Sequence, residues 1–87
     1  MPYIKQDRRH VLDPYLEPLA ERPESPGELN YVITRILLSY MERQGESYST
    51  YNALTGVLEC AKLELYRQWV AGYEDEKIAE NGGVFGC

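Results

Sequence analysis

The stretch that decides the fold is STYNALTGVLECAKLELYRQWVAGYEDEKIAEN, residues 49–81. Apolar residues recur in it at spacings of three and four, which is the pattern of an amphipathic helix that faces a core. We name these residues the first seam: Leu54, Leu58, Ala61, Leu65 and Trp69. The sequence therefore predicts one long helix over residues 49–81, capped by Ser49 or Thr50.

A second seam runs along the roughly opposite side of the same helix at intervals of seven residues. Its apolar members are Gly56, Leu63 and Val70, and its polar and aromatic members are Asn52, Glu59, Tyr66 and Tyr73. Folding explains the first seam, whereas polar and aromatic groups of this kind do not suit a core. A glycine inside a helix costs about 1 kcal/mol relative to alanine, so we expect another backbone or a ligand close to Gly56. The second seam therefore predicts a partner.

The length of this helix also favours assembly. About 30 helical residues span about 45 Å, whereas a compact domain of 87 residues has a radius of gyration near 12 Å and a diameter of roughly 30 Å. The helix either bends, with Gly72 as the expected break, or packs on a neighbouring subunit. Cys60, Cys87 and the single histidine form neither a disulfide framework nor a usual zinc site. Self-association is the expected source of additional stability.

Upstream of the long helix, the sequence predicts an arm and a short helix. Residues 1–12 are interpreted as an extended N-terminal arm with one helical turn near its end. Asp13 is the expected cap of a helix that begins at Pro14, and Pro18 is expected to keep that helix short or irregular because proline lacks an N–H.

The second helix has clearer signals at both ends. Ser25-Pro26-Gly27-Glu28 matches a capping box, in which Ser25 caps the helix and Glu28 reaches back to the Ser25 amide. Gly45 supplies a left-handed stop, and residues 82–87 form a flexible tail that begins with a glycine cap. The predicted fold is a single all-α domain, residues 1–87, with three main helices and a long C-terminal helix, assembling as a homo-oligomer.

Composition excludes several classes of partner. The chain carries 9 basic and 14 acidic side chains, for a formal charge of −5, so a grip on the phosphates of DNA or RNA is not expected. Residues 1–10 lack the apolar run of a signal peptide, and no segment resembles a membrane span. We expect a cytoplasmic protein with no membrane partner. Eight tyrosines against one phenylalanine are typical of interfaces and ligand pockets, where a ring stacks while its hydroxyl meets a polar partner.

No residues form a convincing catalytic set. His10 is the only histidine and lies in the arm. A metal-dependent all-α nucleotide hydrolase would hold magnesium with paired carboxylates, but Glu59 and Glu64 are five residues apart and point to different faces. The acidic run over residues 74–80 is interpreted as a solvated face. We therefore expect no enzyme activity, no metal and no cofactor, and keep the hydrolase as an alternative.

The polar members of the second seam, with residues of the second helix, form a candidate ligand site. Aromatic rings stack on a base, cations bind phosphate, and carboxylate or amide oxygens accept hydrogen bonds from base or ribose. The candidates are Tyr31, Arg35, Asn52, Glu59, Lys62, Tyr66, Arg67 and Tyr73.

Several segments carry a family resemblance. They are Met1-Pro2-Tyr3-Ile4-Lys5, Gly27-Glu28-Leu29-Asn30-Tyr31, Ile33-Thr34-Arg35, Gly56-Val57-Leu58-Glu59-Cys60-Ala61-Lys62-Leu63-Glu64, Tyr66-Arg67, Tyr73-Glu74-Asp75, Lys77-Ile78 and Glu80-Asn81-Gly82. Across nearly the whole chain, they resemble a family of short helical proteins that is common in tailed-phage genomes. Three residues depart from that family's pattern: Pro18, Gly72 and Gly83.

The resemblance in size and organisation to phage immune-signal sponges implies a function. Such proteins bind, without cleaving, the cyclic nucleotides or cyclic ADP-ribose relatives made by bacterial defence systems such as CBASS and Thoeris. The expectation is a non-enzymatic phage protein, in the cytoplasm of an infected host, that sequesters such a signal in pockets between subunits. A structural or protein-binding phage module is the other alternative.

Overall fold

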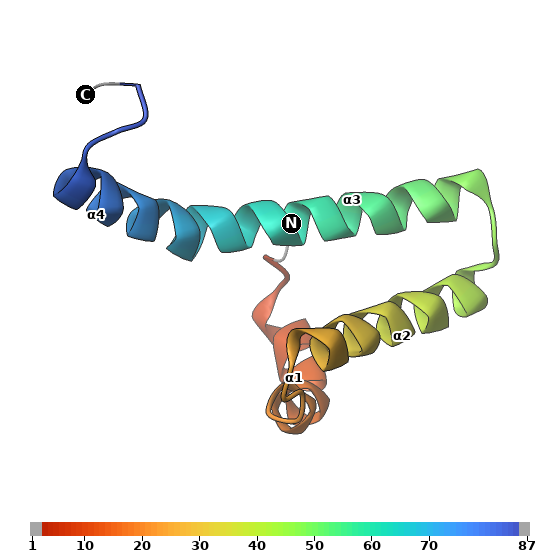
Figure 1. Ribbon diagram of the computed structural model, residues 1–87. Helices are drawn as coiled ribbons and strands as arrows, with labels where there is room; N and C mark the ends of the chain where they lie inside the picture. The colour runs from red at the N-terminus through yellow and green to blue at the C-terminus, as the bar shows by residue number, and fades with distance from the viewer. Residues whose placement is uncertain (1–2, 86–87) are drawn as a thin grey trace.

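The computed structural model describes residues 3–85. The expectations for Met1 and Pro2 of the arm, and for Gly86 and Cys87 of the tail, lie outside these residues. The helical segments are α1 (Gln6–Ala20), α2 (Pro26–Gln44), α3 (Tyr48–Leu65), the π-helical η1 (Tyr66–Val70) and α4 (Ala71–Asn81). No strand occurs within residues 3–85. Because α3, η1 and α4 follow one another without a loop as one long rod (Figure 1), the predicted all-α fold with three main helices is confirmed.

A tight turn folds α2 back beside α3 (Figure 1). Gly45 stops α2 with a φ of 86°, and its N–H donates to the carbonyl of Met41 at 2.8 Å, as the sequence predicted. The cap of α3 lies two residues before the predicted one. Ser47 accepts a hydrogen bond from the backbone N–H of Thr50 at 3.1 Å, and α3 therefore begins at Tyr48.

The start of α2 follows the predicted capping box with one change. The Ser25 hydroxyl accepts from the N–H of Glu28 at 3.2 Å, as expected. The Glu28 carboxylate, however, accepts from the N–H of Glu24 at 3.0 Å rather than from that of Ser25. The return bond therefore extends one residue into the linker that precedes α2.

The first helix differs most from the prediction, because α1 begins at Gln6 and includes both prolines. The carbonyl of Lys5 accepts from the N–H groups of Arg8 and Arg9 at 3.1 Å, and this closes the first turn. The Arg9 side chain also donates to the carbonyl of Ile4 at 2.9 Å. Each proline removes its own N–H bond and crowds the carbonyl four residues before it, but α1 continues through Pro14 and Pro18, which lie four residues apart and fall on one side of the helix. The predicted arm is therefore shortened, within the described residues, to residues 3–5.

The long helix continues through its predicted break at Gly72. Its irregularity is the π-helical η1, which ends two residues before that glycine. The rod ends at Gly82, which has a φ of 84° and confirms the predicted glycine cap. The longest dimension of the molecule is 50 Å, so the overshoot expected from the length of this helix is present.

None of the described residues is buried. The chain has an accessible surface of 7847 Å², whereas a compact monomer of 10.0 kDa has about 5,200 Å². The radius of gyration is 17.1 Å against about 12 Å for a compact chain of this length. The expectation that folding buries the first seam is wrong for the single chain, since Leu65 and Trp69 remain 57% and 69% exposed. No helix within residues 3–85 combines the length and apolar character that a membrane crossing requires.

Candidate functional site

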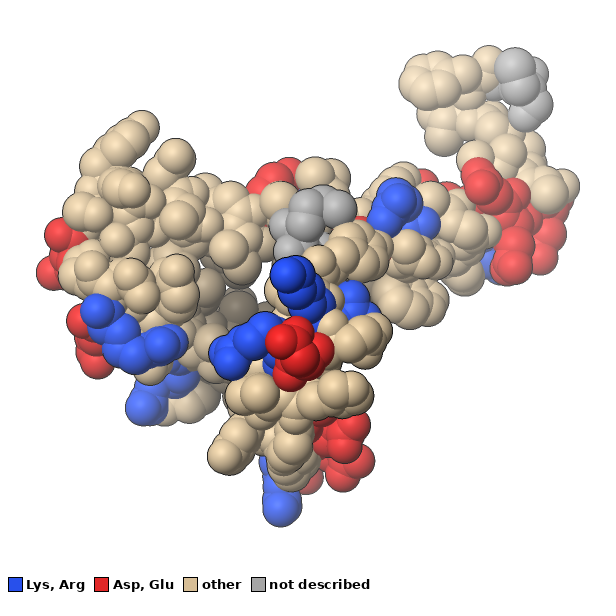
Figure 2. Space-filling view, turned by 180° about the vertical axis from the view of Figure 1, so that it is seen from behind, with Lys and Arg blue, Asp and Glu red and all other residues tan. Residues whose placement is uncertain are grey.

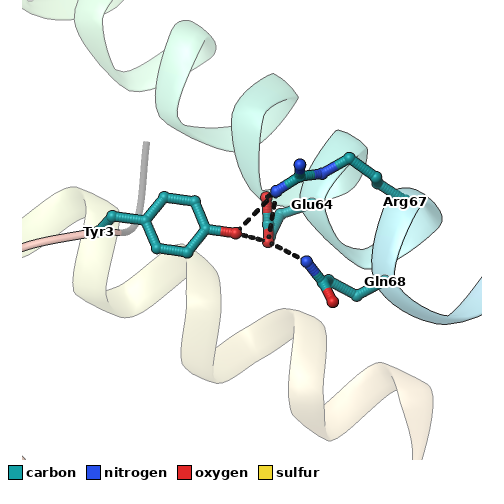
Figure 3. Close-up of polar contacts among 4 residues, drawn as sticks. All are labelled: Tyr3, Glu64, Arg67 and Gln68. Carbon is teal, nitrogen blue, oxygen red and sulfur yellow. Dashed lines mark hydrogen bonds and ion pairs between the residues drawn. The ribbon is translucent and has the colours of Figure 1, made fainter.

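A polar cluster joins the N-terminal segment to the middle of the long helix (Figure 3). The hydroxyl of Tyr3 donates to the carboxylate of Glu64, 61 residues further along the chain. Arg67 donates from the same nitrogen, Nη2, to the Tyr3 hydroxyl at 2.8 Å and to both Glu64 oxygens at 3.0 and 3.2 Å. Gln68 adds a bond to Glu64 at 3.1 Å. We name these residues the arm junction: Tyr3, Glu64, Arg67 and Gln68.

The electrostatics of the arm junction favour an ionised carboxylate. The Tyr3 hydroxyl, followed by Arg67 and Gln68, holds the pKa of Glu64 below its ordinary value, although desolvation opposes this shift. The ion pair with Glu64 raises the pKa of Arg67 further. The Glu64 side chain is 19% exposed and that of Arg67 is 64% exposed, so the anion is enclosed and the cation remains open to solvent.

The arm junction lies where the long helix becomes a π-helix. Glu64 is in the last turn of α3, and Arg67 and Gln68 belong to η1. Single π-helical turns inside α-helices occur frequently at functional sites. Further cations come from the N-terminal segment, where Lys5 follows Tyr3 and Arg9 bonds to Ile4. Figure 2 shows Lys and Arg side chains gathered near the centre of the view, where this segment crosses the long helix. The segment that begins with Tyr3 therefore carries three cations, Lys5, Arg8 and Arg9, with one carboxylate, Asp7, among them.

The two candidate ligand residues of α2 bond to each other. Arg35 donates to the hydroxyl of Tyr31 at 2.8 Å, and its guanidinium carbon lies 5.7 Å from the centre of the same ring. On α3, Glu59 pairs with Lys62 at 3.5 Å, as their spacing predicted, and Asn52 is exposed near the start of the helix. The structure does not bring these residues into one pocket within a single chain.

The π-helical turn changes the register of the second seam. The Tyr66 hydroxyl donates to the carboxylate of Glu74, eight residues on, at 2.5 Å, and this carboxylate raises the pKa of Tyr66. In an uninterrupted α-helix, two residues eight apart differ by about 80° in direction. The extra residue in η1 removes most of that difference, so Glu74 takes the position that the interval of seven assigned to Tyr73. The predicted line from Asn52 to Tyr73 is therefore correct only as far as η1.

Tyr73 belongs to a different site, an apolar groove of about 780 Å³ between α4 and the chain that follows it. Lys77 lies over its ring at 5.5 Å, and the tail adds Val84 and Phe85, which are almost fully exposed. Acidic side chains gather at this end of α4 (Figure 2), and Glu74 itself lines the groove. This environment opposes an anionic ligand.

Sequence reasoning missed Tyr3, Glu64 and Lys77. The Tyr73–Lys77 spacing of four residues on a helix was a usable signal. Nothing in the sequence signalled the bond between Tyr3 and Glu64, because it depends on where α1 directs the N-terminal segment. Within residues 3–85, no three His, Cys, Asp or Glu side chains are grouped closely enough to hold a metal ion.

Comparisons with known proteins give a family but no function. No curated protein and no solved structure matches the chain. A family model described as a domain of unknown function, DUF6899, matches residues 1–84. The match covers nearly the whole sequence, and the chain therefore belongs to the DUF6899 family.

Proposed function

We propose that this protein is a non-enzymatic binding protein that works as a homo-oligomer and holds a small nucleotide-derived ligand at its subunit interfaces. The observation that carries the proposal is that residues 3–85 include no buried side chain, although 44% of the sequence is hydrophobic. The candidate ligand site is the arm junction, together with Tyr66 beside it.

Surface area supports the assembly. The chain exposes about 2,600 Å² more than a compact monomer of its mass. A standard interface takes about 800 Å² from each partner, and obligate interfaces take more. The excess therefore corresponds to a subunit with several covered faces. The second seam is one such face, because Leu63 is 55% exposed and a side chain at Gly56 would meet nothing within 4 Å.

The chemistry of the arm junction supports a ligand with phosphate and a base. The hydrogen bonds of Arg67 to described residues all use Nη2. A guanidinium group offers five N–H donors in a planar fork, so donors remain for a phosphate. Tyr66 is the adjacent residue and presents a ring that is 45% exposed, on which a base can stack. Lys5 and Arg9 add positive charge from the N-terminal segment.

We assign the ligand class from the resemblance to small phage proteins. A cyclic nucleotide or a cyclic ADP-ribose relative combines a flat base with phosphate. The base would stack on the ring of Tyr66, and the phosphate would bond to the guanidinium group of Arg67. Sequestration of such an immune signal, without cleavage, is the proposed role in an infected bacterial cell.

The test is titration calorimetry of the purified protein with cyclic dinucleotides and with cyclic ADP-ribose, followed by mass spectrometry of ligand released on heating. Base stacking on an aromatic ring is worth about 1–3 kcal/mol, and a charge-assisted bond to phosphate is worth about as much. Tyr66→Ala and Arg67→Ala should therefore each weaken binding roughly tenfold to a hundredfold. Arg35→Ala, on α2, is a further candidate variant, and Lys77→Ala in the α4 groove is the matched control.

The outcomes separate the alternatives. Ligand released intact supports sequestration, whereas conversion to product supports a hydrolase. Unchanged affinity in the correctly assembled Tyr66, Arg67 and Arg35 variants would place the site elsewhere. A protein that binds none of these ligands but co-purifies with a host protein would be a structural or protein-binding module.

A further inference from the structure

Helix α1 has an apolar face and no helix of its own chain to cover it. No Cα atom of α1 lies within 8 Å of a Cα atom of α2, α3, η1 or α4. Its apolar residues follow one another at alternating intervals of one and three residues, which places them on one face of a helix that packs against another. This α1 stripe, between 37% and 78% exposed, consists of Val11, Leu12, Tyr15, Leu16 and Leu19.

Helix α2 carries a matching stripe. Its less exposed residues include Leu37 and Met41, near the turn that leads to α3. A second set follows the spacing of three and four along the helix and remains between 41% and 53% exposed. This α2 stripe consists of Leu29, Ile33, Ile36 and Tyr40.

The chain itself holds α1 away from the α2 stripe. At one end, a linker of five residues, 21–25, contains Pro23, which favours an extended conformation for the residue before it. At the other end, the N-terminal segment is tied to the long helix by the bonds of Tyr3 to Glu64 and Arg67. With both ends held, the two stripes of one chain do not meet, and each remains open.

We propose that α1 of one copy packs on the α2 stripe of a second copy. In a dimer with a two-fold axis, α1 of each copy packs on the α2 stripe of the other copy. The α1 and α2 stripes of both copies are then covered at once. The chain as a whole has surface enough for such a contact, since its excess of about 2,600 Å² exceeds the roughly 800 Å² that each partner gives to a standard interface. This docking rests on the proposed homo-oligomer, because it assigns that oligomer an interface.

Charge sets the direction of the docked helix. The start of α1 carries Asp7, Arg8 and Arg9 and is positive overall, and Glu17 lies near its end; α2 has Glu28 at its start and the neighbouring Glu42 and Arg43 at its end. A parallel arrangement places the positive start of α1 beside Glu28, whereas an antiparallel one places Glu17 there. In the parallel register, Leu16 lies beside Ile36, and Leu19 lies beside Tyr40 of the other copy.

Cross-linking between two single-cysteine variants tests this docking. In a background with Cys60→Ala and Cys87→Ala, one variant carries Leu19→Cys, and a second, of different size through a tag, carries Tyr40→Cys. A chain with one cysteine cannot link to itself, so a product of mixed size arises only between copies. We use a bismaleimide with a spacer of about 8 Å, because axes of packed helices lie 8–10 Å apart.

We expect the pair Leu19→Cys and Tyr40→Cys to give at least about ten times as much mixed product as either of two control pairs. Glu17→Cys with Tyr40→Cys moves the thiol off the α1 stripe, and Leu19→Cys with Leu29→Cys tests the antiparallel register. Equal yields in a background that light scattering shows to be oligomeric would overturn the docking while leaving the proposed oligomer intact. A higher yield for the antiparallel pair would overturn the parallel register. A monomeric, folded background would overturn both the docking and the oligomer.

Discussion

Substitution of Leu63 by glutamate should dissociate the proposed homo-oligomer. Leu63 lies on the second seam and is 55% exposed in the single chain. Full burial of a leucine side chain stabilises by about 1.5–3 kcal/mol, so burial of the exposed half of Leu63 in an interface gains about half of that, or about 0.8–1.5 kcal/mol per subunit. In a two-fold dimer both copies lose it, which gives about 1.5–3 kcal/mol, or roughly a 10- to 150-fold weaker dimer. Burial of the glutamate charge adds to this loss.

The assay is a dilution series followed by light scattering for mass and circular dichroism for helix content. Because no described residue is buried in the single chain, dissociation should be accompanied by loss of helix at micromolar concentration. Gln44→Glu introduces the same charge change at the end of α2 and is the matched control. A wild-type protein that stays monomeric and helical would refute the reasoning, as would a Leu63→Glu variant with the dimer constant of the control.

Two further predictions concern local structure. Gly45→Ala, at a φ of 86°, should lower the free energy of unfolding by about 1–2 kcal/mol. Ser47→Ala should lower it by about 1 kcal/mol, because the helix cap is lost. Urea titration at fixed protein concentration measures both changes, and unchanged midpoints would contradict the turn geometry. Tyr3→Phe removes the main donor to Glu64, so the pKa of Glu64 should rise toward its ordinary value of 4.5, which a carbon-13 NMR titration follows. Because that pKa is lowered in the folded protein, the contribution of Glu64 to stability is present above pH 4.5 and is lost as the pH falls through the lowered value. An identical titration of Glu64 in the wild type and in Tyr3→Phe would rule out the contact between Tyr3 and Glu64.

The sequence predicted those features that depend on local chemistry. The capping serine before α2, the left-handed Gly45 and Gly82 and the length of the terminal helix each follow from a few neighbouring residues, and the structure confirms them. The sequence predicts the start of α1 too late, because Asp13-Pro14 matches a helix start and Pro18 matches an interruption, whereas α1 begins at Gln6 and continues through both prolines. The bond between Tyr3 and Glu64 joins residues 61 apart, and no local pattern reports it.

The π-helical turn explains why the candidate site was only partly predicted. An interval of seven residues marks one face only while the helix keeps a constant number of residues per turn. At η1 that number changes, so Tyr66 bonds to Glu74, and Tyr73 lines the separate groove of α4. The eight candidates therefore divide among an α2 pair, the α3 surface, the region of the arm junction and the α4 groove.

Assembly and ligand binding are expected to be coupled in a protein of this shape. In the proposed oligomer, a subunit without buried residues takes its core from its neighbours, and the arm junction ties the segment before α1 to the long helix. A ligand that bonds Arg67 competes for, or adds to, the contacts that hold Tyr3 in place. A ligand that binds only the assembled form stabilises it by RT ln(1 + [L]/Kd), which is about 2.7 kcal/mol at a hundredfold excess over Kd. The melting temperature of the proposed oligomer is therefore a direct screen for the ligand, and Arg67→Ala should abolish the shift that a phosphate-bearing ligand produces, measured against the melting temperature of the same variant without ligand.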